Sequence, residues 1–134
     1  MVHKRLFAER TALAEHFELE LHDCESPQFL LYRPGDFFVP HQDGNSGQLE
    51  FDHLRVRKIS IVVFLNQAGE QTEPDTYGGG SLVFYSDSDL QGTLQTTREL
   101  IGETGLLVAF AAHTTHEVIP VVHGERFSIV SWFK

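Results

Sequence analysis

Apolar residues in the first part of the chain recur at helical spacing, and the pattern then changes to one typical of strands. Leu6, Leu13 and Phe17 would share one face of a helix, which predicts an amphipathic helix over residues 3–20. Residues 22–27 are polar and end in proline, so the helix is expected to end before them. Beyond this segment, short runs of β-branched and aromatic residues alternate with polar, glycine-containing segments, which predicts β-strands.

Strand-like runs fill most of the remaining sequence. The clearest is 57–66, and the others are 29–32, 37–43, 81–85, 96–100, 106–110, 116–122 and 126–133. We expect the last two runs to form a hairpin around His123-Gly124-Glu125, and residues 67–80 to form a polar loop. One helix followed by about eight strands predicts an all-β barrel or sandwich with a helical buttress. A small barrel of this kind encloses room for one small ligand.

Length and composition narrow the class of protein. The 134 residues favour a single domain, with 1–27 as the helical buttress and 28–134 as the β-structure. The net charge of −9 repels phosphate backbones and anionic lipid, so we expect neither nucleic acid nor a membrane as partner. The one cysteine, Cys24, cannot form an internal disulfide and suits a reducing compartment. No apolar run approaches the roughly 20 residues of a membrane span, and we expect a cytoplasmic protein.

A pair of metal-binding residue types lies in the expected strand at 37–43. His41 and Asp43 are two positions apart, so both side chains would project from the same face of a strand. Two histidines and one carboxylate can hold a non-haem Fe(II) on one triangular face and leave the opposite face open. His116, in a late strand, would complete this set if the fold brings the first and last strands together, as barrel closure does.

Three late histidines compete for the place of third ligand. His116 is preferred because it precedes Arg126 at a spacing that a hairpin could place on adjacent strands. His113 is expected in a turn and His123 at the hairpin tip, and the ordinary interpretation of both is a solvated loop histidine.

Arg126 is a candidate anion clamp. Its planar guanidinium can make two parallel hydrogen bonds to one carboxylate. The ordinary alternative is a surface salt bridge, which contributes little to stability. Combined with the histidine–carboxylate set, an anion clamp is what an oxygenase that consumes an oxo-diacid requires.

A series of short motifs carries a resemblance to a known family. The motifs are Tyr32-x-x-Gly35, His41-x-Asp43, Arg57-x-x-Ser60 before Phe64-Leu65-Asn66, Gly79-Gly80-x-Leu82-x-Phe84, and His116-x-x-x-Pro120-Val121-x-x-Gly124-x-Arg126 before Trp132-Phe133. In this order and spacing, residues 29–133 resemble the Fe(II)- and 2-oxoglutarate-dependent dioxygenases, in their prolyl 4-hydroxylase-like branch. The resemblance implies a double-stranded β-helix, the jelly-roll or cupin-like fold, which agrees with the strand count.

The resemblance also implies an oxidoreductase that couples decarboxylation of 2-oxoglutarate to hydroxylation of a substrate C–H bond. It implies Fe(II) on His41, Asp43 and His116, with O₂ as co-reactant and ascorbate as reductant. The far carboxylate of 2-oxoglutarate would pair with Arg126, helped by Tyr32 and Ser128. No catalytic residue beyond the metal ligands is expected.

One position departs from this pattern. Many relatives carry a tyrosine where this chain has Phe64, and the tyrosine hydroxyl also contacts the cosubstrate carboxylate.

The substrate is less well defined by the sequence. Arg57 and Trp132 match positions near the substrate side of the iron, although Trp132 also fits a core aromatic at a strand end. A prolyl residue in a protein or peptide is the first expectation, by analogy alone. The alternatives are a free amino acid or other small molecule, or a non-catalytic sensor of iron or oxo-acids. A zinc hydrolase is a further alternative, but Glu117, its candidate general base, would point away from the metal.

Overall fold

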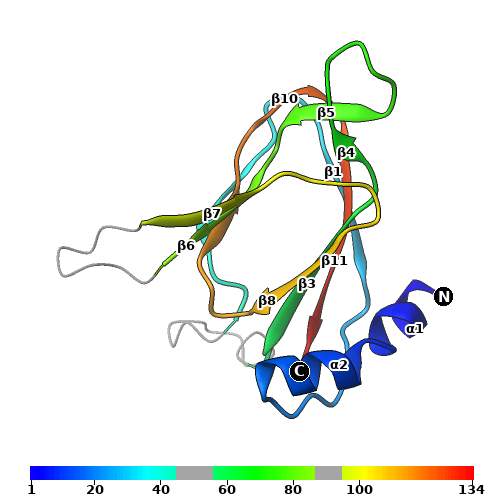
Figure 1. Ribbon diagram of the computed structural model, residues 1–134, viewed down its shortest axis with the longest axis vertical. Helices are drawn as coiled ribbons and strands as arrows, with labels where there is room; N and C mark the ends of the chain where they lie inside the picture. The colour runs from blue at the N-terminus through cyan, green and yellow to red at the C-terminus, as the bar shows by residue number, and fades with distance from the viewer. Residues whose placement is uncertain (45–55, 87–94) are drawn as a thin grey trace.

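The computed structural model describes residues 1–44, 56–86 and 95–134, which form two short helices and eleven strands. The helices are α1 (Val2–Phe7) and α2 (Arg10–Phe17). The strands are β1 (Gln28–Tyr32), β2 (Phe38–His41), β3 (Ile59–Phe64), β4 (Gln67–Ala68), β5 (Thr76–Gly79), β6 (Leu82–Tyr85), β7 (Thr96–Leu100), β8 (Leu107–Ala111), β9 (His116–Val118), β10 (Val121–Gly124) and β11 (Arg126–Phe133). Figure 1 shows both helices at one end of the strands and β4, β5 and β10 at the other.

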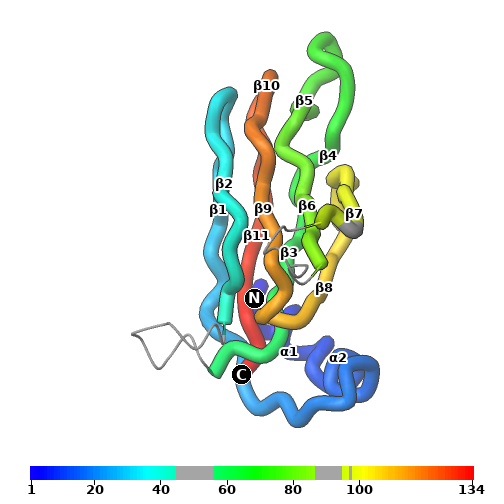
Figure 2. The backbone as a smooth tube through the Cα atoms, turned by 90° about the vertical axis from the view of Figure 1, so that its left-hand side faces the viewer, coloured from blue at the N-terminus to red at the C-terminus, as the bar shows by residue number. Residues whose placement is uncertain are grey.

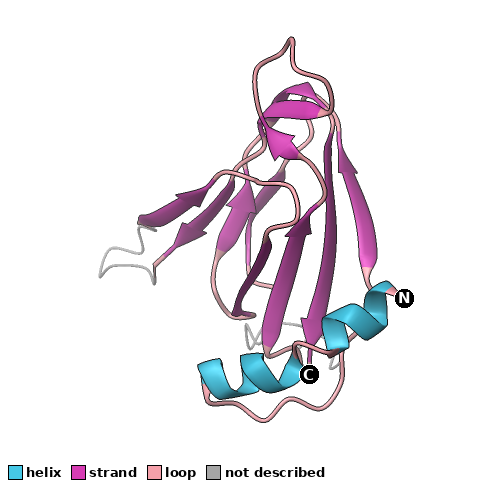
Figure 3. Cartoon of the chain, turned by 45° about the vertical axis from the view of Figure 1, so that its right-hand side comes forward, coloured by secondary structure: helices cyan, strands magenta, loops and turns pink. Residues whose placement is uncertain are grey.

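Three sheets make up the β-structure. Two are four-stranded, in the orders β1-β11-β3-β8 and β2-β9-β6-β7, and the third is three-stranded, in the order β10-β5-β4. The two four-stranded sheets are antiparallel throughout. Figure 2 shows their strands running along the long axis of the molecule, and Figure 3 shows the two sheets facing each other above the helices. The first and last strands, β1 and β11, are direct neighbours, with Tyr32 opposite Arg126.

Strands β3 and β11 are buried on both faces because each separates two hydrophobic clusters. Ile59, Ile61, Ile129 and Phe133 face outward against Leu6 of α1, with Phe17 of α2 packed on the same cluster. On the other face, Val62 and Phe64 pack against residues of the second sheet, among them Leu82, Phe84 and Val118. Burial on both faces accounts for the nearly continuous apolar run of residues 59–64.

The expected single helix over residues 3–20 is divided in two. A turn at Ala8 and Glu9 separates α1 from α2, and the Glu9 backbone N–H donates to the Leu6 carbonyl three residues back. The turn allows Leu6 and Phe17 to reach the same cluster under the sheet. Neither helix in the described part of the chain has the length or apolar character that a membrane span needs.

The expected hairpin between residues 116–122 and 126–133 is wrong. Pro120 separates β9 from β10, β9 pairs with β2 and β6, and β10 pairs with β5. Strand β11 crosses to the opposite sheet, where it pairs with β1 and β3. The segment 67–80, expected as a loop, contains β4 and β5. Residues 44–52 are polar and contain glycine, which predicts a loop, and all of them except Gly44 lie outside the described residues.

Candidate metal centre and anion site

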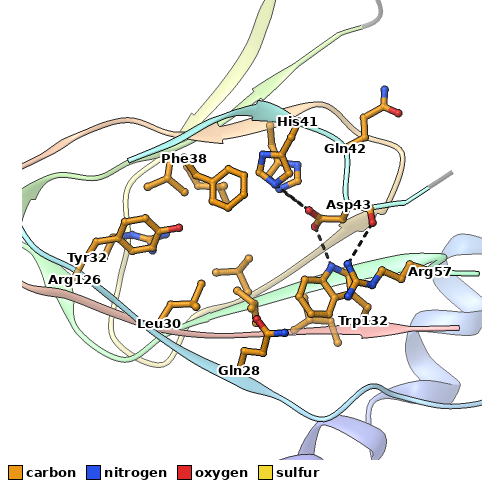
Figure 4. Close-up of a pocket in the computed structure, with 16 residues that line it drawn as sticks. Gln28, Leu30, Tyr32, Phe38, His41, Gln42, Asp43, Arg57, Arg126 and Trp132 are labelled. Carbon is orange, nitrogen blue, oxygen red and sulfur yellow. Dashed lines mark hydrogen bonds and ion pairs between the residues drawn. The ribbon is translucent and has the colours of Figure 1, made fainter. Parts of the chain in front are cut away.

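A cavity of about 350 Å³ lies between the two four-stranded sheets, and both sheets contribute to its lining. Figure 4 shows His41 and Asp43 at one end of the labelled side chains and Tyr32 with Arg126 at the other. Val62 and Val130 from one sheet and Leu82 and Val118 from the other line the cavity as well, so its wall is largely apolar.

The metal-binding end joins two neighbouring strands of the second sheet. His41 ends β2 and lies opposite His116 of β9 in the register of the sheet. Asp43 follows the strand rather than belonging to it, because the backbone N–H groups of Asp43 and Gly44 both donate to the Ala112 carbonyl. One ligand atom from each of His41, Asp43 and His116 lies within 4.8 Å of the others. The loop, and not strand alternation, therefore turns Asp43 toward the histidines.

Backbone carbonyls fix the orientation of both imidazoles. Nδ1 of His41 lies 2.8 Å from the Val39 carbonyl oxygen, and Nδ1 of His116 lies 2.9 Å from that of Thr114. Because Nδ1–H must be the donor in each bond, Nε2 is directed toward the Asp43 carboxylate, at 3.0 Å for His41 and 3.5 Å for His116. Metal-ligating histidines are commonly held in this way by a second hydrogen bond.

The Asp43 carboxylate is anchored through one oxygen and presents the other. Oδ2 accepts hydrogen bonds from the Ser60 hydroxyl at 2.7 Å and the Trp132 indole N–H at 3.1 Å, while Oδ1 faces both histidines. Burial raises the pKa of Asp43, but the hydrogen bond with His41, the charge of His116 and the two donors at Oδ2 outweigh it and lower the pKa from 3.8 to about 2. The Asp43 carboxylate is therefore charged at neutral pH.

The two histidines have opposite pKa shifts. Burial lowers the pKa of His41, but its hydrogen bonds with Asp43 and the Val39 carbonyl outweigh burial and raise it. Burial lowers the pKa of His116, with the attraction of Asp43 opposing it only in part. His116 therefore takes up a proton less readily than His41, and a metal ion would compete with protons more strongly at His41 than at His116.

Arg126 occupies the opposite end of the cavity in an aromatic setting. Its side chain is 1% exposed, and its guanidinium carbon lies 5.0 Å from the centre of the Tyr32 ring and 5.2 Å from that of Phe64. Nη1 donates to the Ser128 hydroxyl at 3.1 Å. Within the described part of the chain, no carboxylate lies at ion-pairing distance from Arg126. The surface salt bridge that the sequence allowed is therefore not what holds this residue.

Arg57 and Trp132 lie beside the metal-binding end. The Arg57 guanidinium stacks 3.7 Å from the centre of the Trp132 ring and pairs with both oxygens of Glu25, at 2.7 and 3.0 Å. Trp132 is buried, as a core aromatic would be, yet it also lines the cavity and donates to Asp43. No motif in the sequence marks Glu25, because its pairing with Arg57 is visible only in the fold.

The other candidate side chains lie away from the cavity. His113 is exposed in a turn, and His123 lies in β10 rather than at a hairpin tip, against Gly78. Glu117 accepts a hydrogen bond from the Tyr85 hydroxyl on the face of β9 opposite His116. A hydrolytic general base is therefore not available from Glu117.

Comparison with known proteins agrees with this site. A family model described as the 2OG-Fe(II) oxygenase superfamily matches residues 27–134, which contain the histidine–carboxylate set and Arg126. The chain belongs to this superfamily. A PKHD-type hydroxylase of Rhizorhabdus wittichii is 32% identical over 109 residues, which cover 81% of this chain and 42% of that protein. The chain thus spans less than half the length of the curated relatives it matches.

Solved oxygenase structures share the fold. A prolyl-4-hydroxylase of Pseudomonas putida is 28% identical with a TM-score of 0.65, and the match covers 96% of this chain and 62% of that one. A viral collagen prolyl hydroxylase of Paramecium Bursaria Chlorella virus-1 has a TM-score of 0.68 at 19% identity, covering 98% and 72%. The jelly roll expected from the sequence is confirmed.

The superfamily implies Fe(II), 2-oxoglutarate and O₂, and the residues present fit them. Two imidazole nitrogens and one carboxylate oxygen are the donor set for Fe(II) with open positions. At the other end of the cavity, a buried guanidinium without a carboxylate partner among the described residues suits a bound dicarboxylate.

Proposed function

We propose that this chain is an Fe(II)- and 2-oxoglutarate-dependent hydroxylase that acts on a C–H bond of a peptide or protein, with a prolyl residue as the first candidate. The relatives named PKHD-type hydroxylase and prolyl-4-hydroxylase support the reaction class. His41, Asp43 and His116 are the proposed iron ligands, and Arg126, Ser128 and Tyr32 the proposed cosubstrate contacts.

The observation that carries the proposal is the buried charge of Arg126. A buried cation without a partner is strongly unfavourable, and the Ser128 hydroxyl and two aromatic faces compensate it only in part. An anion bound in the cavity would supply the missing charge. Because the same cavity contains the metal-binding set, one molecule with a carboxylate at its far end and a chelating oxo-acid at its near end fits both sites.

In this mechanism the protein binds, orients and excludes water. When bound, iron and 2-oxoglutarate supply the oxidising power: O₂ is consumed, 2-oxoglutarate leaves as succinate and CO₂, and one oxygen atom enters the substrate. Asp43 and the two histidines, each fixed by a second hydrogen bond, would hold the iron. Arg126 orients the cosubstrate from the opposite end, and the apolar wall excludes water.

The size and charge of the site favour a peptide over a free amino acid. A cavity of about 350 Å³ has room for the cosubstrate and one oxidised side chain, so most of a larger substrate would remain outside. Glu25 already neutralises Arg57, which leaves a flat, uncharged wall rather than a free cation for a substrate carboxylate. Phe37 and Phe38, 58% and 47% exposed, offer an apolar surface beside His41 for the flanking residues.

The proposal also includes a reductant and a cellular compartment. Ascorbate would serve as the reductant that keeps the iron ferrous. We place the protein in the cytoplasm because Cys24, buried and hydrogen-bonded to Ser131, has no second cysteine in the sequence and suits a reducing compartment.

Turnover tests the proposal directly. Succinate is measured with Fe(II), ascorbate, 2-oxoglutarate and peptide pools that contain proline, and hydroxylated product is identified by mass. Arg126→Met should weaken 2-oxoglutarate binding by about 2–5 kcal/mol, and so raise the concentration of 2-oxoglutarate required, and should leave metal binding intact. Arg33→Met is the matched control, because Arg33 is exposed and paired with Glu125.

The outcomes separate the alternatives. An unchanged 2-oxoglutarate requirement in Arg126→Met would show that Arg126 does not bind the cosubstrate carboxylate. If the chain binds Fe(II) and 2-oxoglutarate but forms no succinate with any peptide or amino-acid pool, it is a sensor of iron or oxo-acids and not a hydroxylase. If only free amino acids are hydroxylated, the substrate is a free amino acid and not a peptide.

A further inference from the structure

Two buried polar atoms near the anion site lack a hydrogen-bond partner within the part of the chain that the structure describes. They are the Tyr77 hydroxyl and Nε of Arg126. Both residues are 1% exposed, so bulk solvent does not reach either atom. An unpaired buried polar group is unfavourable, and each such group in a folded protein calls for an explanation.

The two atoms belong to side chains that meet at the same place. A Cβ built on Gly80 would lie 3.1 Å from Cδ of Arg126, the atom bonded to Nε, and 3.4 Å from Cε2 of Tyr77. Arg126 also acts on the Tyr77 phenol: burial raises the pKa of Tyr77, and the charge of Arg126 together with a hydrogen-bonding contact between the two side chains opposes that rise. The phenol oxygen accepts in that contact, so its own O–H is still an unused donor. Both donors therefore lie in one electrostatic environment around Arg126, which lines the end of the cavity.

The position of the hydroxyl is also defined by Phe64 and Gly102. A Cβ on Gly102 would lie 2.0 Å from the Tyr77 hydroxyl oxygen and 2.7 Å from Cδ1 of Phe64. Only glycine leaves the space that the hydroxyl occupies there. The Phe64 ring lies against the guanidinium and has no polar atom, so Tyr77 is the source of a hydroxyl at this edge of the ring.

We propose that Tyr77 is a cosubstrate-binding residue: its O–H and the Nε–H of Arg126 are the unused donors that grip the distal carboxylate of 2-oxoglutarate. This inference rests on the proposed function. Nη1 of Arg126 is already engaged by Ser128, so Nε is free for the ligand. A carboxylate has two oxygens and accepts both hydrogens, which would satisfy both unpaired atoms at once.

Tyr77→Phe tests the role of the hydroxyl without removing the ring. Binding of 2-oxoglutarate is measured by calorimetry on protein loaded with Mn(II) in place of Fe(II), so that no turnover is needed. Losing one hydrogen bond to a charged group should weaken binding by about tenfold to a hundredfold. The ligand-free variant should unfold at the same temperature as the native chain or higher, because an unpaired buried hydroxyl has been removed.

A second ligand separates a direct contact from a general disturbance. 2-Oxopentanoate has the same chelating end but no distal carboxylate, so Tyr77→Phe should leave its binding unchanged. Equal weakening for both ligands would overturn the proposal. Tyr85→Phe is the matched control, because Tyr85 bonds to Glu117 away from the cavity, and it should bind both ligands normally.

Moving the hydroxyl to the neighbouring ring completes the test. Phe64→Tyr in the Tyr77→Phe background places a phenol against the guanidinium again and should recover most of the lost affinity. Tyr77→Phe with native 2-oxoglutarate affinity would overturn the inference while leaving the proposed function standing. Failure of the native chain to bind 2-oxoglutarate at all would remove the proposed function itself.

Discussion

Deleting the Ser60 hydroxyl should weaken metal binding although Ser60 is not a ligand. Ser60 lies in β3 of the opposite sheet, is 1% exposed, and donates to Oδ2 of Asp43 at 2.7 Å. Only the longer bond from Trp132, at 3.1 Å, would remain on that oxygen in Ser60→Ala. The carboxylate would then rotate more freely, and Oδ1 would face the two histidines for a smaller part of the time.

The magnitude follows from the bond that is lost. A hydrogen bond to a charged group contributes about 1.5–3 kcal/mol, which corresponds to roughly a tenfold to hundredfold loss of Mn(II) or Fe(II) affinity. Since the Ser60 hydroxyl is one of the groups that lower the pKa of Asp43 to about 2, that pKa should also rise in the variant. Anaerobic metal titration at neutral pH measures the loss of affinity, and an acid titration of the Asp43 carboxylate in the metal-free protein measures the change in its pKa.

Ser131→Ala is the matched control for this experiment. Ser131 is equally buried, but its hydroxyl donates to the Glu25 carbonyl on the outward side of β11. It should bind metal like the native chain. Native metal affinity in Ser60→Ala, or an equal loss in both variants, would refute the argument that the Oδ2 anchor orients the carboxylate.

Three further predictions concern the proposed metal ligands themselves. His116→Ala should abolish Fe(II) binding in stoichiometric titrations, whereas His113→Ala, at an exposed turn, should bind Fe(II) normally. The reverse result would show that His113, and not His116, is the third ligand. In the metal-free protein, the pKa of Asp43 is 3.8 unfolded and about 2 folded, so its carboxylate contributes about 2 kcal/mol that is fully present above pH 3.8 and lost as the pH falls toward 2. Urea unfolding of Asp43→Asn should therefore depend less on pH in that window, and an unchanged dependence would contradict the shift. Metal affinity should also fall as the pH decreases, beginning above the ordinary histidine pKa of about 6.5, because the pKa of His41 is raised and a metal ion competes with the proton there.

The sequence predicted the parts of the site that depend on residue type and order. His41, Asp43, His116 and Arg126 were identifiable because few other chemistries use two imidazoles, a carboxylate and a late guanidinium. The β-rich character from residue 28 onward was equally visible, since period-two and β-branched patterns are local properties.

The features that the sequence missed depend on pairing between distant strands. The hairpin expected around His123 was wrong because local pattern cannot distinguish a turn that returns the chain to its neighbour from one that sends it to another sheet. Ser60 belonged to a motif but had no assigned role, because its bond to Asp43 crosses between sheets. Glu25 and Tyr77 carried no motif, and only their contacts with arginine side chains distinguish them from ordinary surface and core residues.

The positions of His116 and Arg126 in different sheets determine how the site should respond to mutation. Had His116 and Arg126 been on paired strands, any change at one would disturb the other through the shared backbone hydrogen bonds. Instead, β9 holds His116 in one sheet and β11 holds Arg126 in the other, and only the cavity and its apolar core lie between them. Substitutions at the two ends should therefore add independently in metal-only binding, since they share no partner. Coupling should appear only with 2-oxoglutarate present, because that ligand would be the one physical connection between the metal and the guanidinium.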